Sequence, residues 1–172
     1  MKRPGKEILE PLNLGDTLSP GDLISTGVGA RAQIFFKDGA FLNLSENARL
    51  MISLYIYAKE PSGRKLGIRL YAGSLRVVAA TRTVGTSSIL VETDYASIRT
   101  SFSDFIVSED DASTEVYVFK NALLLRNLSA IATDKVQLKS GYWSRVDDKK
   151  EPLKSKVITS KSRRQLLAST NL

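Results

Sequence analysis

Apolar and polar side chains alternate with a period of two along residues 31–54, and this pattern constrains the fold more than any other feature of the chain. A period of two is that of a pleated strand, whose successive side chains point to opposite faces. Polar breaks at 37–39 and 45–47 divide the stretch into three strands. The Asp38-Gly39 pair favours a type I′ hairpin turn, because both central residues of that turn need positive φ. On the third strand, Ile52 and Leu54 are predicted to share the buried face.

The remainder of the chain repeats this pattern. Pro20-Gly21 favours a type II turn, and Gly73, Asn121 and Gly141 mark further turns, with Gly73 between two strands and Asn121 between two paired strands. About a dozen short strands at this spacing predict an all-β domain. We expect short antiparallel strands in two packed sheets or in a β-solenoid-like stack. The further strands are predicted at 22–26, 66–71, 75–79, 89–93, 97–107, 114–119, 123–127, 136–138 and 142–146.

Charge and composition suggest three regions. The formal charge is +7, and residues 149–172 carry seven Lys and Arg against one Glu. The predicted division is a flexible N-terminal leader at 1–17, an all-β domain at 18–148 and a basic tail at 149–172. The tail lacks strand alternation and is expected to be disordered or to form a short helix near 162–168.

The chain contains neither cysteine nor histidine. Disulfides, thiolate metal sites and cysteine nucleophiles are therefore excluded, and so are the commonest general base and metal ligand. We predict a protein that is not an enzyme, with no catalytic, cofactor-binding or metal-binding residue. No apolar run approaches the roughly 20 residues of a transmembrane helix, and no apolar region follows the basic N-terminus, so neither a transmembrane segment nor a signal peptide is expected in this chain.

Two acidic groups were weighed as reactive sites. The tip 109–111 could offer carboxylates to a calcium ion, but calcium loops space their ligands and need a Gly kink, so we favour a solvated hairpin loop. Asp94 and Asp104 could form a carboxylate pair for glycoside chemistry, but nothing in the sequence places them together.

Aromatic and arginine side chains alternate with the predicted core positions. Such side chains can stack on a partner protein, on sugar rings or on bases. Ordinary packing of a second layer is the alternative, and we favour it unless the aromatics prove to be exposed together. The candidate partner-binding residues are Tyr55, Tyr57, Arg69, Tyr71 and Arg76.

The order of turns and strands resembles the FecR-type domain of bacterial cell-surface signalling proteins over about 18–146. The segments that carry the resemblance are 20–27, with its Gly-Asp and Thr-Gly, 32–40, which ends in Asp-Gly-Ala, 70–75, 91–98, 116–127 and 138–142. Asp94 stands where the family has Pro, 101–105 lacks its Arg-Gly-Thr step, and Asn121 stands where Gly is usual. The chain is therefore similar to a divergent member.

The resemblance implies a regulatory or scaffolding envelope domain that binds a protein partner, similar to anti-sigma regulators and located in the periplasm or otherwise outside the cytoplasm. A cytoplasmic location stays open as the alternative. A carbohydrate- or cell-wall-binding module that uses the aromatic face is the first rival function. The second is binding of nucleic acid or an anionic surface through the basic tail, and we do not favour nucleic acid as the partner.

Overall fold

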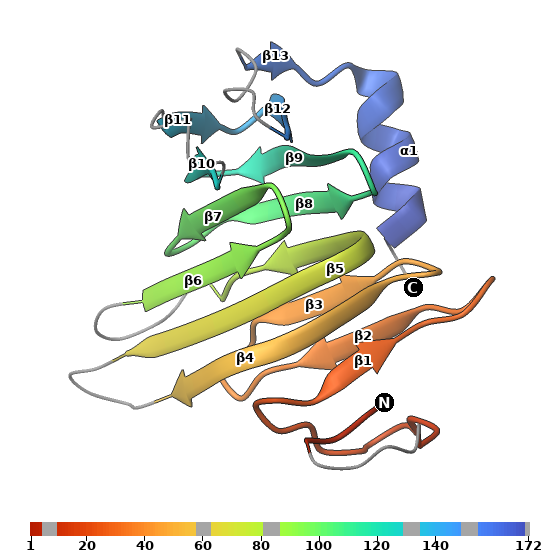
Figure 1. The fold of residues 1–172 in the computed structure, drawn as a ribbon. Coiled ribbons are helices and arrows are strands. Elements are labelled where there is room, and N and C mark those ends of the chain that lie inside the picture. The colour runs from red at the N-terminus through yellow and green to blue at the C-terminus, as the bar shows by residue number, and fades with distance from the viewer. Residues whose placement is uncertain (5–9, 58–62, 81–86, 129–134, 149–154, 171–172) are drawn as a thin grey trace.

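The structure is a computed structural model, and it describes residues 1–4, 10–57, 63–80, 87–128, 135–148 and 155–170. Thirteen strands and one helix occur in these residues, so the prediction of an all-β fold with a short C-terminal helix is confirmed. The strands form one curled, mixed sheet that is folded into two layers, here called sheet I and sheet II (Figure 1). Sheet I contains β1 (Leu23–Ser25), β4 (Arg49–Tyr57), β6 (Ser87–Glu92), β7 (Ala96–Thr100), β10 (Ala122–Asn127) and β11 (Lys135–Lys139). Sheet II contains β2 (Ala32–Phe35), β3 (Phe41–Leu44), β8 (Asp104–Glu109), β9 (Ser113–Lys120), β12 (Tyr142–Asp147) and β13 (Lys156–Val157).

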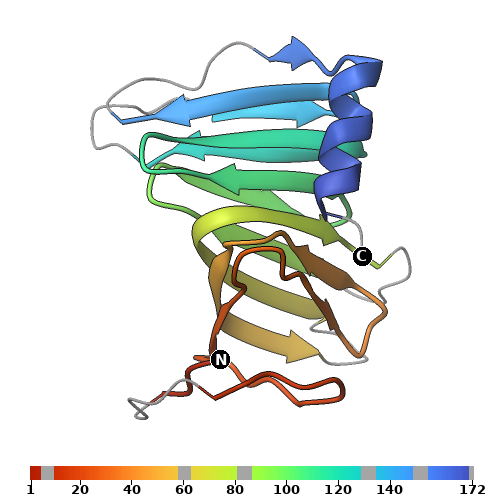
Figure 2. The same ribbon diagram turned by 90° about the vertical axis from the view of Figure 1, so that its right-hand side faces the viewer.

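Strand β5 (Arg64–Val78) joins the two layers, because its first part pairs with β4 and β6 and its last part with β3 and β8. Figure 2 shows this strand curling from one layer into the other. The bend lies at Gly73, whose φ is 80°. A Cβ at this position would lie 2.6 Å from the Cα of Ala48, so no other residue type fits without a shift of the backbone. Gly73 therefore bends one continuous strand, which differs from the predicted turn between two strands.

Beyond β5 the chain adds antiparallel strand pairs alternately to the two layers: β6–β7 to sheet I, β8–β9 to sheet II, β10–β11 to sheet I and β12–β13 to sheet II. Asn121, with φ of 62°, and Gly141, with φ of 86°, lie where the chain crosses between layers. The predicted pairing of β9 with β10 is therefore wrong, because the left-handed residue between them sends β10 into the opposite sheet.

One strand pair departs from the antiparallel pattern that the sequence predicts. Strand β6 runs parallel to the first part of β5, from the Arg64↔Ser87 pair to the Arg69↔Glu92 pair. The reason is that β5 passes through both layers before the chain returns to sheet I, so β6 enters on the side where β5 began. The path of the chain through both layers along β5 and back to sheet I at β6 is the part of the molecule that matches the predicted β-solenoid-like stack.

The core lies between the two sheets. Inward-facing side chains from both layers form one cluster, and burying each large aliphatic side chain contributes about 1.5–3 kcal/mol. Its fully buried members include Leu42, Leu44, Leu50, Leu70, Leu75, Val77, Ile89, Val91, Ile98, Phe105, Val107, Val116, Val118 and Leu125.

Both ends of the described chain lie against the sheets. Lys2 exchanges two backbone hydrogen bonds with Leu23, at 2.7 and 2.8 Å, so the first residues extend sheet I beyond β1. Helix α1 (Ser160–Thr170) begins after Thr159, whose Oγ1 accepts the Ser162 N–H at 3.1 Å as an N-cap. The helix runs beside the stacked strands in both views (Figures 1 and 2). The predicted domain limits at 17/18 and 148/149 stay predictions, and residues 5–9 and 149–154 lie outside the described part of the chain.

Candidate interaction surface

The outer face of sheet I brings two of the predicted partner-binding residues together. The Tyr71 ring lies between two guanidinium groups, with the Cζ of Arg49 5.4 Å and that of Arg69 5.8 Å from the ring centroid. Arg69 is held in turn by an ion pair with Asp94 and by a 2.6 Å hydrogen bond to the Thr93 carbonyl. The result is a fixed cation–aromatic cluster, here called the Tyr71 cluster.

Tyr55 is not part of that face. A β-bulge between Ile52 and Leu54 shifts the alternation of β4, so Tyr55 pairs with the buried Leu66 and its ring packs 4.9 Å from that of Phe36. Burial, and next the negative charge of Asp38, raise the pKa of Tyr55. The prediction that Leu54 is buried is wrong for the same reason, because its side chain is 42% exposed.

The bulge depends on Gly67, which pairs with Leu54. A Cβ at Gly67 would lie 2.6 Å from the Ser53 Oγ, so a side chain at this point of β5 would collide with the bulged strand. Bulges leave no clear mark in a single sequence, and the alternation alone therefore assigned the wrong face.

The remaining two candidates lie elsewhere. Tyr57, at the end of β4, is 41% exposed. Arg76 belongs to the part of β5 in sheet II, where its Nε and Nη2 donate to the two carboxylate oxygens of Asp104 at 3.0 and 2.9 Å. The five candidates therefore do not form one face, and a flat exposed row of Tyr55, Tyr57 and Tyr71 is not formed.

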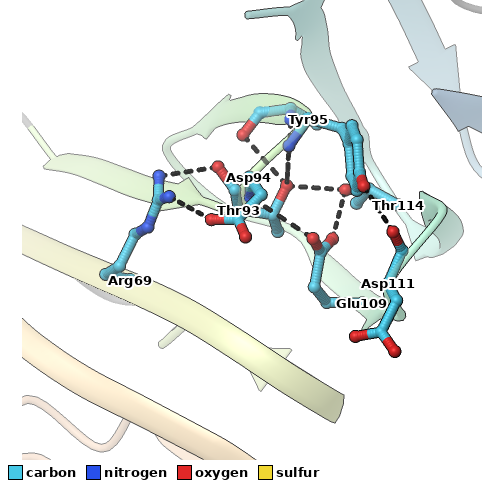
Figure 3. Close-up of polar contacts among 8 residues, drawn as sticks. Arg69, Thr93, Asp94, Tyr95, Glu109, Asp111 and Thr114 are labelled. Atoms are coloured by element: carbon cyan, nitrogen blue, oxygen red, sulfur yellow. Dashed lines mark hydrogen bonds and ion pairs between the residues drawn. The ribbon is translucent and has the colours of Figure 1, made fainter. Parts of the chain in front are cut away.

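A buried carboxyl group lies beside the Tyr71 cluster, where the turns of β6–β7 and β8–β9 meet (Figure 3). Glu109 is 5% exposed, accepts a hydrogen bond from the Thr114 hydroxyl and accepts the Asp94 N–H at 3.3 Å. The Thr114 Oγ1 is 2.6 Å from that of Thr93. Burial raises the pKa of Glu109 to about 7, although the hydrogen bonds from Thr114 and Asp94 lower it. In the sequence, this residue is recognisable only as part of the acidic tip at 109–111.

The rest of that tip caps its own turn. The Asp110 Oδ1 accepts the N–H groups of Ala112 at 2.8 Å and Ser113 at 2.7 Å. The hydrogen bond from the Ala112 N–H is the largest cause of the lowered pKa of Asp110. With Glu109 turned inward and Asp110 used by the turn, the three residues do not converge on a common point. Across the described residues, no group of three or more acidic side chains is arranged to hold a metal ion.

At the opposite end of the sheets, Arg64 and Asp38 form a completely buried ion pair. Arg64 also donates to the Ser87 Oγ at 2.8 Å and to the Ser101 carbonyl at 3.1 Å. Asp38 reaches this position because the 36–40 loop is not the predicted type I′ turn. Gly39 alone has positive φ, at 85°, and its N–H donates to the Phe36 carbonyl at 3.0 Å, the pattern of a type I turn followed by a left-handed glycine.

The predicted type II turn at Gly21 is present in the structure. Its φ is 94°, and the Asp22 N–H donates to the Ser19 carbonyl at 3.1 Å, which is the type II arrangement.

The two acids that are candidates for a catalytic pair lie at opposite ends of the sheets. Asp94 is paired with Arg69, and Asp104 is paired with Arg76. None of the described helices has both the length and the apolar character to cross a membrane.

Helix α1 flanks a groove of about 520 Å³ on the outer face of sheet II. The Tyr117 and Trp143 rings are stacked at 5.4 Å on its floor. Arg163 of the helix lies 5.6 Å above the Phe119 ring, and Lys156 lies 5.6 Å from the Trp143 ring. Sheet II is therefore partly covered on its outer side, and the groove's walls also include Val157, Ile158, Thr159, Ser162, Gln165, Leu166 and Ser169.

Comparison with known proteins gives a family match and a fold match. The model of the family described as "FecR protein" matches residues 22–124. Two crystal structures of a protein described as a "putative anti-sigma factor" from Parabacteroides distasonis are similar, with TM-scores of 0.67 and 0.65 and 15% sequence identity in each case. The similarity covers 85% of this chain and 64% of each of those chains, so it concerns the fold of part of a longer protein. No curated protein matches the sequence.

Proposed function

The chain belongs to the FecR family, and on this premise we propose that it is a non-enzymatic regulatory domain that binds a protein partner in the bacterial envelope. The fold shared with a protein described as an anti-sigma factor supports a role in signalling of that type. The proposed location is the periplasm, as the family resemblance implies. Fold alone does not fix function, so the proposal also needs a surface that is suited to binding.

The observation that carries the proposal is the difference between the two outer faces. Helix α1 lies over sheet II, whereas none of the described elements covers the outer face of sheet I around the Tyr71 cluster. There the guanidinium groups of Arg49 and Arg69 lie over the Tyr71 ring, and Asp94 orients Arg69. Preorganised tyrosine and arginine side chains are the residue types that dominate binding energy at protein interfaces.

The polar side chains support a binding role over catalysis. Three of the buried or half-buried arginines are paired with carboxylates, as Arg64 with Asp38, Arg69 with Asp94 and Arg76 with Asp104. The chain contains neither histidine nor cysteine, and these three ion pairs hold strands and turns together.

The proposal can be tested in the source bacterium. We expect deletion of the gene to change transcription of the genes controlled by one sigma factor, measured by RNA sequencing, and expression of the wild-type chain to restore it. A Tyr71→Ala variant should restore regulation only in part, whereas Phe35→Ala, a matched exposed aromatic on sheet II, should restore it fully. Unchanged transcription after deletion contradicts the regulatory role, and full rescue by Tyr71→Ala removes the Tyr71 cluster from the binding surface.

A further inference from the structure

The outer face of sheet I contains a row of residues, in register from one strand to the next, that runs across six strands. The register of each strand pair connects one member of the row to the next, from β4 through β5, β6, β7 and β10 to β11. Strands are spaced about 4.8 Å apart, so the row is roughly 24 Å long. Its members are Leu54, Gly67, Leu90, Arg99, Leu124 and Gln137.

The row is unusually apolar for the solvent side of a sheet. Leu54 is 42% exposed and Leu124 36% exposed, and Ile56, on the same face of β4, is 43% exposed. The outer side of an antiparallel sheet is normally polar, because only the inner side is needed for the core. A line of exposed leucines on a rigid sheet is therefore a candidate contact surface.

Cations surround this row. Lys65 stands on the same outward side of β5, and Arg49 is held in the Tyr71 cluster. Arg99, Arg126, Lys135 and Lys139 follow on β7, β10 and β11, and none of these four forms an ion pair with another described residue. The acids on this side are Glu92 and Asp94, and Asp94 is bound to Arg69.

Sheet II has a different charge distribution. On its outer face Asp104 pairs with Arg76, and Glu115 lies 3.9 Å from Arg145. The positive charge of the folded strands is thus concentrated on sheet I, and this was not expected from a sequence whose basic residues are most dense in the tail. An excess of positive charge on one face of a sheet attracts and orients a partner of the opposite charge.

We propose that the outer face of sheet I binds an acidic surface of a partner protein that carries aliphatic side chains, and this rests on the proposed protein-binding function. The leucines of the row supply apolar contacts. Charge complementarity comes from the cations that form no ion pair with any described residue, namely Arg99, Arg126, Lys135 and Lys139. A width of roughly 24 Å suits the approximately 800 Å² that each partner buries in a standard protein interface.

Two features favour a protein over other anionic ligands. Surfaces that read single-stranded nucleic acid present aromatic rings on which bases stack. Here the exposed side chains of the face are aliphatic, namely those of Leu54, Ile56 and Leu124. Proteins that lie on a membrane bury apolar side chains about 5–10 Å below the head groups, whereas the side chains of Leu54, Ile56 and Leu124 are each more than half covered by the sheet and do not project to that depth.

The test uses the full chain and four defined probes: a random Glu–Leu copolymer, poly-Glu, phosphatidylglycerol vesicles and a single-stranded oligonucleotide. Binding is measured by fluorescence anisotropy or flotation at several salt concentrations. The key variant is Arg99→Glu/Arg126→Glu. Its matched control is Lys161→Glu/Arg164→Glu, which makes the same change of charge on the exposed face of α1. Circular dichroism and thermal unfolding confirm that each variant is folded.

We expect the wild-type chain to bind the Glu–Leu copolymer more tightly than poly-Glu, with an affinity that falls as salt rises. The Arg99→Glu/Arg126→Glu variant should lose about tenfold or more in affinity, and the α1 control less than about twofold. Leu54→Ser/Leu124→Ser should reduce binding of the copolymer to the level of poly-Glu, because the apolar anchors are gone.

Three outcomes overturn the proposal. If the α1 control loses binding of the copolymer and Arg99→Glu/Arg126→Glu keeps it, the basic tail binds the copolymer and sheet I does not. Tighter binding of vesicles or of the oligonucleotide than of the copolymer identifies an anionic surface other than protein. Full transcriptional rescue by Arg99→Glu/Arg126→Glu rejects this surface while the regulatory function stands, whereas failure of the proposed function itself appears as unchanged transcription after gene deletion.

Discussion

The two ends of the stacked sheets are both closed by buried polar side chains, but they balance charge in different ways. At one end Arg64 and Asp38 neutralise each other, and Ser87 and Ser101 accept hydrogen bonds from the same guanidinium. At the other end Glu109 is buried against the hydroxyl of Thr114, while the nearby Arg69 is bound to Asp94. The first end therefore contains two opposite charges in contact, and the second has a carboxyl group that titrates near neutral pH.

The comparison shows how location determines what a buried ionisable group does. A buried ion pair stays charged as a unit, and removing one partner leaves the other charge without compensation. A buried carboxyl group without a cation shifts its pKa instead. The free energy of unfolding should consequently depend on the presence of both charged residues at the Arg64 end. At the Glu109 end it should depend on pH.

The largest expected effect is loss of the buried cation. Replacing Arg64 by Met leaves the Asp38 carboxylate buried without its partner and should lower the free energy of unfolding by about 3–5 kcal/mol. The measurement is denaturant unfolding at pH 7. The double variant Arg64→Met/Asp38→Leu should recover most of the loss, because neither charge is then buried. A single variant as stable as wild type would mean that the pair is not buried in solution.

A pair of glycines, one at each end, provides the next test. Gly73→Ala places a Cβ 2.6 Å from the Ala48 Cα at positive φ and should cost about 3 kcal/mol or more. Gly39→Ala has the same sign of φ but no atom within 4 Å of the new Cβ, so its cost should be only about 1–2 kcal/mol. Equal losses in thermal unfolding would contradict the close approach of β5 to Ala48.

Stability should also depend on pH through Glu109. The pKa of this residue is raised from 4.5 to about 7 in the folded state, so between these values the folded protein binds more protons than the unfolded chain. The free energy of unfolding should therefore fall as pH rises from about 4.5 through 7, by up to about 3 kcal/mol from this group.

The matched variants isolate that contribution. Glu109→Gln should flatten the fall in stability between pH 5 and pH 8, whereas Glu92→Gln, on the exposed side of β6, should leave it unchanged. Urea unfolding at four or five pH values measures both. A fall that persists in Glu109→Gln would assign the pH dependence to another group.

The smallest effect concerns the hydroxyl that supports this carboxyl group. Thr114→Val removes the hydrogen bond to Glu109 and should cost about 1–2 kcal/mol, with a greater loss at pH 8 than at pH 5, because hydrogen bonds to an ionised acceptor are the stronger ones. The same substitution should raise the pKa of Glu109 further, which NMR titration of its side-chain carboxyl carbon detects. An equal loss at both pH values would contradict an ionised acceptor.

Much of the fold followed from local patterns in the chain. The alternation placed most of the strands, and Gly21, Asn121 and Gly141 adopt the left-handed conformations that their residue types favour. Of the five candidate partner-binding residues, Arg69 and Tyr71 lie together, and their role in binding stays a prediction. The bulge at Ser53 turns Tyr55 inward and Leu54 outward. The residue types on this strand do not reveal the bulge, so the alternation alone assigns both side chains to the wrong face.

Backbone preference and side-chain period act between neighbours in the chain, and so the sequence alone determined an all-β protein with glycine and asparagine corners and without cysteine or histidine chemistry. Only the tertiary structure decided that Arg64 meets Asp38, that Glu109 loses its solvent, and that leucines and cations from six strands line one outer face. Those results depend on which strands pair and in which register, and residues far apart in the chain determine both.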